Sequence, residues 1–138
     1  IFPEAEIVMP NEIGVGGLPR DFDFAFLTVD QFELLTDNSI DLAINCHSFQ
    51  EMTHEQIDFY FKLIQRVCRE SGFFFTSNRL EKIPCGADAF SVEQLDPPNR
   101  FAEYPWDLRN EVLVYEVNRL IRLVQLEGVS IRLECIHK

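Results

Sequence analysis

The sequence has little positive charge. Lys and Arg together number 12, against 23 Asp and Glu, which gives a formal net charge of -11 at pH 7. A surface of this sign repels phosphate backbones and anionic lipid headgroups. No apolar run is long enough to span a bilayer either. We therefore expect neither a nucleic-acid partner nor a membrane partner.

The cysteines are few and scattered. None of the four, Cys46, Cys68, Cys85 and Cys135, forms a CxxC pair, so the spacing indicates neither a zinc ribbon nor a redox motif. Scattered thiols of this kind are typical of a reducing compartment, which predicts a cytoplasmic location. No paired acids with a nearby histidine stand out, and we predict no metal site.

Two glycine motifs are also missing. The stretch from Gly14 to Pro19 is glycine-rich, but it is not GxGxxG and proline follows it instead of a helix, which favours a turn over a phosphate-binding loop. The chain has no GxSxG elbow, which argues against a hydrolase of the α/β class. Its first residue is Ile1 rather than Met, and we expect a fragment of a longer domain.

What is present indicates one folded domain over residues 1–138. A hydrophobic content of 46% with 13 phenylalanines is enough for a sizeable core. Short apolar runs predict strands at Glu6–Met9 and Phe24–Leu27, and Gln31–Leu35 fits one helical turn. The apolar run Ile40–Cys46 does not alternate, which predicts a strand covered on both faces, as in a parallel sheet.

The next segment has the pattern of a helix. Thr53 and Gln56 have the spacing of a capping box, and apolar residues then recur at helical intervals through Cys68. Gly72 is predicted to end the helix in the left-handed position after the C-cap. Phe73–Thr76 is the next strand. Strand, helix and strand together predict a βαβ unit.

The last third of the chain is less regular. Ile83–Pro105 is predicted to be a long loop, and Glu111–Val124 fits either a helix or a strand because its apolar spacing and its β-branched residues disagree. Val129–Cys135 alternates and predicts a half-buried strand. The fold class is α/β: a Rossmann-like three-layer sandwich, mainly parallel, with an antiparallel strand near the C-terminus.

A polar loop, residues 45–52, follows the strand Ile40–Cys46. In open α/β sheets, ligands bind outside the carboxyl ends of the strands. The Asn, His, Ser, Gln and Glu of this loop are therefore candidate site residues.

Two sequence stretches point to a family. DLAINCHSFQEM, which starts at Asp41, and GFFFTSNR, which ends at Arg79, resemble the later part of a class I S-adenosylmethionine-dependent methyltransferase. More narrowly, INCHSFQEM and FFFTSNR look like the sugar O-methyltransferases of bacterial polysaccharide gene clusters. The resemblance implies S-adenosylmethionine as cofactor and a sugar hydroxyl as methyl acceptor.

The resemblance also implies positions for the cofactor. The acid at the end of the family's second strand binds the ribose, and Glu12 is the acid available there, although Asn11 stands near the matching place. Asp30 matches the acid that reaches the adenine amino group. Asn45 falls in the loop that faces the transferring methyl and is assigned to the cofactor.

The acceptor side follows from the same loop. His47 is the candidate general base, because an imidazole titrates near neutrality, and the alternative is a histidine that only binds loop backbone. Glu51 is the second catalytic candidate, or simply an acid favoured at a helix N-terminus. Ser48, Arg79 and Trp106 are assigned to the substrate. Arg79 could instead form a structural salt bridge, and Trp106 could be a core anchor instead of a stacking platform for a sugar.

The resemblance leaves one element unmatched. The family carries a glycine-rich loop after its first strand, which holds the methionine part of the cofactor, and this chain has none. The matching strand would lie mid-sheet beside Ile40–Cys46, so we expect an exposed strand edge there, filled by another copy or by a missing N-terminal segment. The alternative function is a non-catalytic α/β interaction module that keeps the fold.

Overall fold

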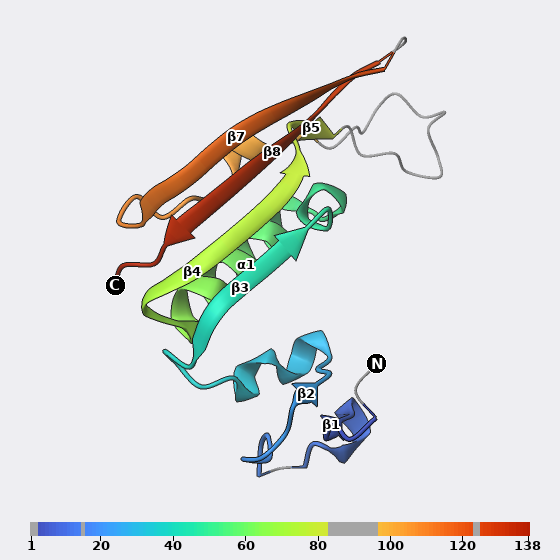
Figure 1. The fold of residues 1–138 in the computed structure, drawn as a ribbon, viewed down its shortest axis with the longest axis vertical. Helices are drawn as coiled ribbons and strands as arrows, with labels where there is room; N and C mark the ends of the chain where they lie inside the picture. Colours follow the sequence, from blue (N-terminus) through green and yellow to red (C-terminus); the bar gives the residue numbers. More distant parts are fainter. Residues whose placement is uncertain (1–2, 15, 83–96, 123–124) are drawn as a thin grey trace.

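The structure, a computed structural model, describes residues 3–14, 16–82, 97–122 and 125–138. Its centre is a four-stranded sheet with one α-helix against one face (Figure 1). The strands lie in the order β3 (Ile40–Cys46), β4 (Cys68–Arg79), β8 (Gln125–Cys135) and β7 (Glu111–Arg122). β3 and β4 are parallel, and the other two pairs are antiparallel, so the sheet is mixed.

The β3–helix–β4 unit agrees with the sequence prediction. Helix α1 (His54–Val67) begins after Thr53, whose hydroxyl accepts from the Gln56 amide at 3.3 Å. The Gln56 side chain accepts in return from the Thr53 amide at 2.9 Å, which completes the predicted capping box. The helix connects two parallel strands, as expected for a βαβ unit.

The predicted role of Gly72 is wrong. The helix ends at Val67, Cys68 is already extended, and Gly72 lies inside β4. A Cβ at Gly72 would lie 2.9 Å from the carbonyl oxygen of Arg69 and 3.2 Å from that of Asp41. The residue is glycine because the backbones of β3 and β4 approach closely there, and the left-handed backbone belongs to the preceding Ser71, with φ 61°.

The core lies between α1 and one face of the sheet. Its buried residues are Phe49, Ile57, Phe61, Cys68, Phe74, Phe101, Tyr104 and Ile136. On the other face, Leu42, Ile44 and Phe73 remain 47%, 64% and 41% exposed. Ile40–Cys46 is therefore not covered on both faces by the described residues. These residues form two layers instead of three, which corrects the three-layer, mainly parallel prediction within the α/β class.

The ambiguous segment is a strand. β7 occupies Glu111–Arg122 and pairs with β8 along its length, with a register shift between Val112 and Val114. The predicted antiparallel strand Val129–Cys135 is confirmed within β8. Much of the predicted loop Ile83–Pro105 lies outside the described residues. Its described end contains β6 (Asn99–Arg100), which pairs with β5 (Glu81–Lys82), and the 3-10 helix η4 (Phe101–Glu103).

The N-terminal unit, residues 3–37, lies apart from the main sheet (Figure 1). It contains β1 (Ile7–Val8), η1 (Pro10–Glu12), β2 (Phe24–Ala25) and η2 (Val29–Leu34), and β1 and β2 form their own parallel pair. The unit joins α1 through Arg66, whose guanidinium donates to the carbonyls of Phe32 and Leu35 at 3.1 and 2.8 Å. The Phe32 and Tyr60 rings meet edge to face, with centroids 5.9 Å apart.

No helix in the described part of the chain is long and apolar enough to cross a membrane.

Candidate functional site

The strand-end loop, residues 45–52, leaves the carboxyl end of β3 beside the end of β4. Asn45 pairs with Thr76 and Cys46 with Ser77 in the parallel register. The His47 amide continues the ladder by donating to the Ser77 carbonyl at 2.8 Å. The short 3-10 helix η3 (Phe49–Glu51) then turns the chain toward α1, with Phe49 buried in the core. The loop thus begins as an extension of the sheet and is anchored in the core.

A buried amide network fixes the start of this loop. The fully buried Asn78 side chain donates to Asn45 Oδ1 and to Thr76 Oγ1, both at 2.9 Å, and accepts from the Gln50 amide at 3.4 Å. Asn45 in turn donates to the hydroxyl of Ser48. A buried amide without partners is costly, so this network favours one loop conformation.

A second set of contacts fixes the end of the loop. The buried Gln50 side chain accepts from the Arg79 amide at 2.8 Å. The Asn99 side chain donates to the carbonyls of Gln50 and Met52, at 3.2 and 2.6 Å. Sequence reasoning assigned no role to Asn78 or Asn99. Asn78 follows a predicted strand, and this position could have marked it as a residue near the strand-end loop. Nothing in the sequence around Asn99 predicts its contact with the loop.

His47 sits at a strained position within this fixed loop. Its φ is 56°, in the left-handed region, which few residues other than glycine adopt and which histidine tolerates better than most. The residue is exposed, and within the described chain its ring has no hydrogen-bond partner. Strained backbone of this kind persists only where the surroundings enforce it, and it is frequent at functional sites. The loop therefore presents an accessible imidazole.

Glu51 is held as an anion. Lys82 Nζ lies 2.8 and 2.9 Å from its two carboxylate oxygens, and Gln50 Nε2 donates to it at 3.1 Å. The hydrogen bond from Lys82 is the main cause that lowers the pKa of Glu51, with Gln50 adding to it and desolvation opposing it. A carboxylate with a lowered pKa is a poor proton acceptor and a good charged anchor. Sequence reasoning missed Lys82.

The cofactor acids lie outside the strand-end loop. Glu12 accepts from the Met9 amide at 2.8 Å and so caps η1, and Asp30 is exposed on η2. Gln31 ties these two short helices together by donating to the Pro10 carbonyl at 2.9 Å. Both acids therefore belong to the N-terminal unit.

Trp106 lies in the aromatic core. Its indole nitrogen donates to the Phe101 carbonyl at 3.0 Å, and its ring centroid is 5.1 Å from those of Phe61 and Phe101. The Arg132 guanidinium lies over the ring, 4.1 Å from its centroid. These contacts fit a core anchor. Arg79 is the last residue of β4 and Ser48 precedes η3 in the strand-end loop, and sugar contact by Arg79, Ser48 or Trp106 stays a prediction.

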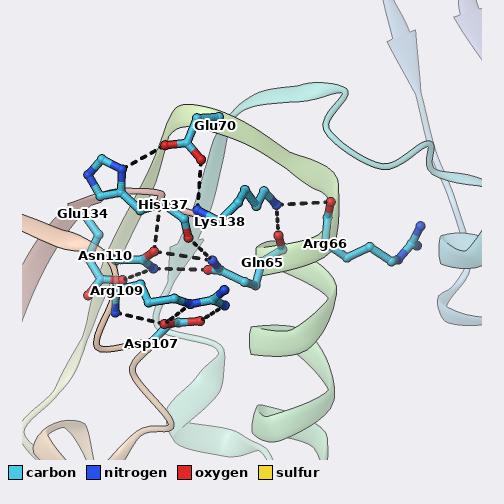
Figure 2. A network of polar contacts seen from close by, with 9 residues as sticks. All are labelled: Gln65, Arg66, Glu70, Asp107, Arg109, Asn110, Glu134, His137 and Lys138. Atoms are coloured by element: carbon cyan, nitrogen blue, oxygen red, sulfur yellow. Dashed lines mark hydrogen bonds and ion pairs between the residues drawn. The ribbon is translucent and has the colours of Figure 1, made fainter.

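A second polar cluster lies at the opposite end of the sheet, where α1 ends and β4 begins (Figure 2). The buried Glu134 carboxylate pairs with Arg132 and accepts from Asn110 Nδ2 at 3.2 Å. Gln65 Nε2 donates to the His137 carbonyl at 2.7 Å. A groove of about 710 Å³ runs along this cluster. The polar side chains of this cluster already have partners within the chain. The cluster therefore ties α1 to the last residues of the chain.

The described residues fit only part of S-adenosylmethionine. The assignment of Glu12 and Asp30 to the ribose and the adenine stays a prediction. So does that of Asn45, whose side-chain amide is already hydrogen-bonded to Asn78 and Ser48. No described loop offers the run of backbone amides that would hold the amino-acid end. The described residues also contain no group of three metal-ligating side chains, and the expectation of no metal stays a prediction.

Comparison with solved structures identifies the fold. A methyltransferase from Methanosarcina mazei, described as SAM-dependent, matches with a TM-score of 0.55 and 10% identity, over 88% of this chain and 73% of its own. The chain has a methyltransferase-like fold. A SAM-dependent methyltransferase from Leishmania major matches with a TM-score of 0.50 and 14% identity, over 83% of this chain, which spans about half (47%) of that protein. Neither a family model nor a curated protein matches the sequence.

Proposed function

We propose that this chain is part of an S-adenosylmethionine-dependent O-methyltransferase, acting on a hydroxyl of a sugar or polysaccharide precursor in the cytoplasm. The observation that carries the proposal is His47. An exposed imidazole, held on strained backbone at the carboxyl end of a parallel strand, occupies the part of an α/β sheet where ligands bind. The methyltransferase-like fold supports the choice of reaction, and the sugar acceptor rests on sequence resemblance.

In this function, His47 accepts the proton of the acceptor hydroxyl, so that the oxygen is a better nucleophile. Asn45 and Ser48 form a hydrogen-bonded pair beside it that can orient the acceptor or the cofactor. S-adenosylmethionine supplies the methyl group when bound, with Glu12 and Asp30 as the acids for its adenosine part. Glu51, paired with Lys82, provides fixed negative charge rather than a second base.

Arg79 and Trp106 complete the proposed acceptor side. Arg79 is placed at the strand end by the hydrogen bond from its amide to Gln50, where its guanidinium can pair with an acidic sugar substituent. Trp106 would stack on a sugar only by giving up contacts with Phe101 or Arg132, so its contribution is the weaker part of the proposal.

The test uses His47→Ala with His54→Ala as the matched control, because His54 is also exposed but lies in the first turn of α1. In a longer form of the protein that includes a glycine-rich loop, His47→Ala should lower kcat by about 10²–10⁴-fold. Cofactor affinity and melting temperature should change little, and His54→Ala should leave all three near normal. Normal turnover of a folded His47→Ala protein would remove the base assignment.

Calorimetry tests the cofactor assignment separately. Residues 1–138 alone should bind S-adenosylmethionine poorly or not at all, because only the adenosine-side acids are present. Micromolar binding by this chain would show that residues 1–138 hold the methionine part of the cofactor as well, which would contradict the assignment.

A second function is a non-catalytic interaction module with the same fold. The exposed apolar face of β3 and β4 favours it, because such a surface suits a protein partner. Binding of S-adenosylmethionine and methyl transfer by a longer form of the protein would favour the enzyme. Absence of both, together with a stable complex with a protein partner, would favour the interaction module.

A further inference from the structure

β7 is an outer strand of the main sheet. Within the described part of the chain it pairs only with β8, and Figure 1 shows it on the side of the sheet away from β3. The slot beside β3 is expected to hold the missing strand of the methyltransferase-like fold, so β7 is the edge left without an assigned neighbour. The amide and carbonyl groups along such an edge can pair with a strand of another chain.

β7 is apolar and is exposed on both of its faces. Val114 stands opposite Leu133 and Tyr115 stands opposite Arg132, so Val114 and Tyr115 point to opposite faces of the sheet. Val114 is nevertheless 37% exposed and Tyr115 49%. Three further large apolar side chains of this strand are exposed: Val112, Leu113 and Val117. An added strand would therefore bury apolar surface on both faces of β7.

The regular part of β7 is long enough to pair as one unit. The strand has 12 residues, and its register with β8 shifts between Val112 and Val114. Residues 114–122, after the shift, exceed the typical strand length of about 5–6 residues and contain neither proline nor glycine. Because the shift lies near the start of the strand, a regular edge remains beyond it.

The charges of β7 have an order along the strand. Its acids, Glu111 and Glu116, lie in the first part, and its bases, Arg119 and Arg122, lie in the second part. Two copies of β7 aligned in the same direction would bring like charges together. Two antiparallel copies bring the acidic part of each strand to the basic part of the other. A second copy of this strand is therefore a partner whose charge order fits.

We propose that the free edge of β7 pairs antiparallel with β7 of a second copy of this chain, around a twofold axis, so that the two main sheets join into one. The axis reverses the strand direction, so the two strand-end loops lie at opposite ends of the joined sheet. The proposal is independent of the proposed methyl transfer, because β7 and β3 are on opposite sides of the sheet. Since only one strand of each copy takes part, the interface is small and the dimer should be weak.

Sedimentation velocity over a range of protein concentrations tests for the dimer. The experiment is done at physiological salt, where repulsion between two acidic chains is screened beyond about 8 Å. Residues 1–138 should convert from monomer to dimer as the protein concentration rises. Hydrogen exchange at residues 114–118 should slow over the same concentration range, while exchange in β3 should stay unchanged.

Two charge-swap variants test the partner. One carries Glu111→Arg with Glu116→Arg, and the other carries Arg119→Glu with Arg122→Glu. Each variant alone has charges of one sign along β7 and should stay monomeric, whereas an equal mixture of the two should dimerise. The first variant is also less acidic overall than the wild type, so an effect of net charge alone would make it dimerise better.

Two single substitutions test the location. Val117→Lys should raise the dissociation constant of the dimer by about tenfold or more, because each dimer loses two exposed apolar contacts and gains two like charges. Ile44→Lys is the matched control, since Ile44 is 64% exposed on β3, and it should leave the dissociation constant unchanged. Circular dichroism confirms that each variant is folded.

Several results would overturn the proposal. These are a wild-type chain that stays monomeric at all concentrations, a folded Val117→Lys protein that dimerises normally, or exchange protection on β3 instead of β7. Dimerisation of the first charge-swap variant as strong as that of the wild type, or a mixture of folded swap variants that stays monomeric, would exclude antiparallel self-pairing of β7.

Discussion

Removal of the Asn78 side chain should destabilise the protein strongly. In Asn78→Ala, Thr76 Oγ1 and Asn45 Oδ1 lose their 2.9 Å donor, and the Gln50 amide loses its acceptor. Thr76 and Gln50 are buried, so water cannot readily replace these bonds. At about 1–3 kcal/mol for each buried group left without a partner, and with the 3.4 Å contact discounted, the expected loss is about 3 kcal/mol.

Urea unfolding at neutral pH measures this loss, with Asn118→Ala as the control. Asn118 is exposed on β7, and its replacement should change the free energy of unfolding by less than about 0.5 kcal/mol. A loss of about 3 kcal/mol is a large part of the total stability of a typical domain. If Asn78→Ala costs no more than Asn118→Ala, the amide network does not hold the strand-end loop.

Asn78→Asp separates the effect of lost hydrogen bonds from the effect of lost side-chain volume in Asn78→Ala. The aspartate side chain has nearly the same shape, but a carboxyl group replaces the NH2 group that donates to Asn45 and Thr76. Buried beside Asn45 Oδ1, the new carboxylate should have a folded-state pKa above its unfolded value of about 3.9. An acid with a raised folded-state pKa destabilises the fold as pH rises above the unfolded value. The deficit of Asn78→Asp should therefore grow between about pH 4 and pH 7, while that of Asn78→Ala stays flat.

Two further changes test the fold away from the site. Gly72→Ala should cost more than about 1 kcal/mol of unfolding free energy, because its Cβ would lie 2.9 Å from the Arg69 carbonyl oxygen, whereas Gly14→Ala has open space and should be near neutral. The pKa of Asp107 is lowered to about 2, chiefly by hydrogen bonds from Arg109. Since its folded-state pKa lies below the unfolded one, Asp107 stabilises the protein above about pH 4 and loses this effect as pH falls toward 2. Asp107→Asn should therefore cost less than about 1 kcal/mol at about pH 6 and close to nothing near pH 2, measured by urea unfolding.

The sequence predicted those elements whose signals are local. The bounds of β3 follow from the apolar run Ile40–Cys46, and the start of α1 follows from Thr53 and Gln56, because both patterns act within a few residues. The position of the strand-end loop follows from these two elements. His47, Ser48 and Glu51 could therefore be placed in one loop at the end of β3 without knowledge of the rest of the fold.

The errors come from contacts between distant segments. Gly72 has the right position to end a helix, yet it lies inside β4, where a side chain would meet the carbonyl of Arg69 and also those of Asp41 and Ile40 on the neighbouring strand. The pattern of Glu111–Val124 fits both a helix and a strand, and pairing with β8 decides for a strand at Glu111–Arg122. Asn99 and Lys82 reach the strand-end loop from far along the chain, and residue type alone does not reveal such contacts.

The strand-end loop and the N-terminal unit are held by different hydrogen bonds. The strand-end loop is held by β4 and by Asn78, Gln50 and Asn99, and none of these bonds uses the outer edge of β3. Glu12 and Asp30, by contrast, lie on the N-terminal unit, which shares no strand pairing with the main sheet and joins α1 through Arg66. It follows that the placement of Glu12 and Asp30 depends on the contacts of Arg66, whereas the surroundings of His47 depend on the amide network of the strand-end loop.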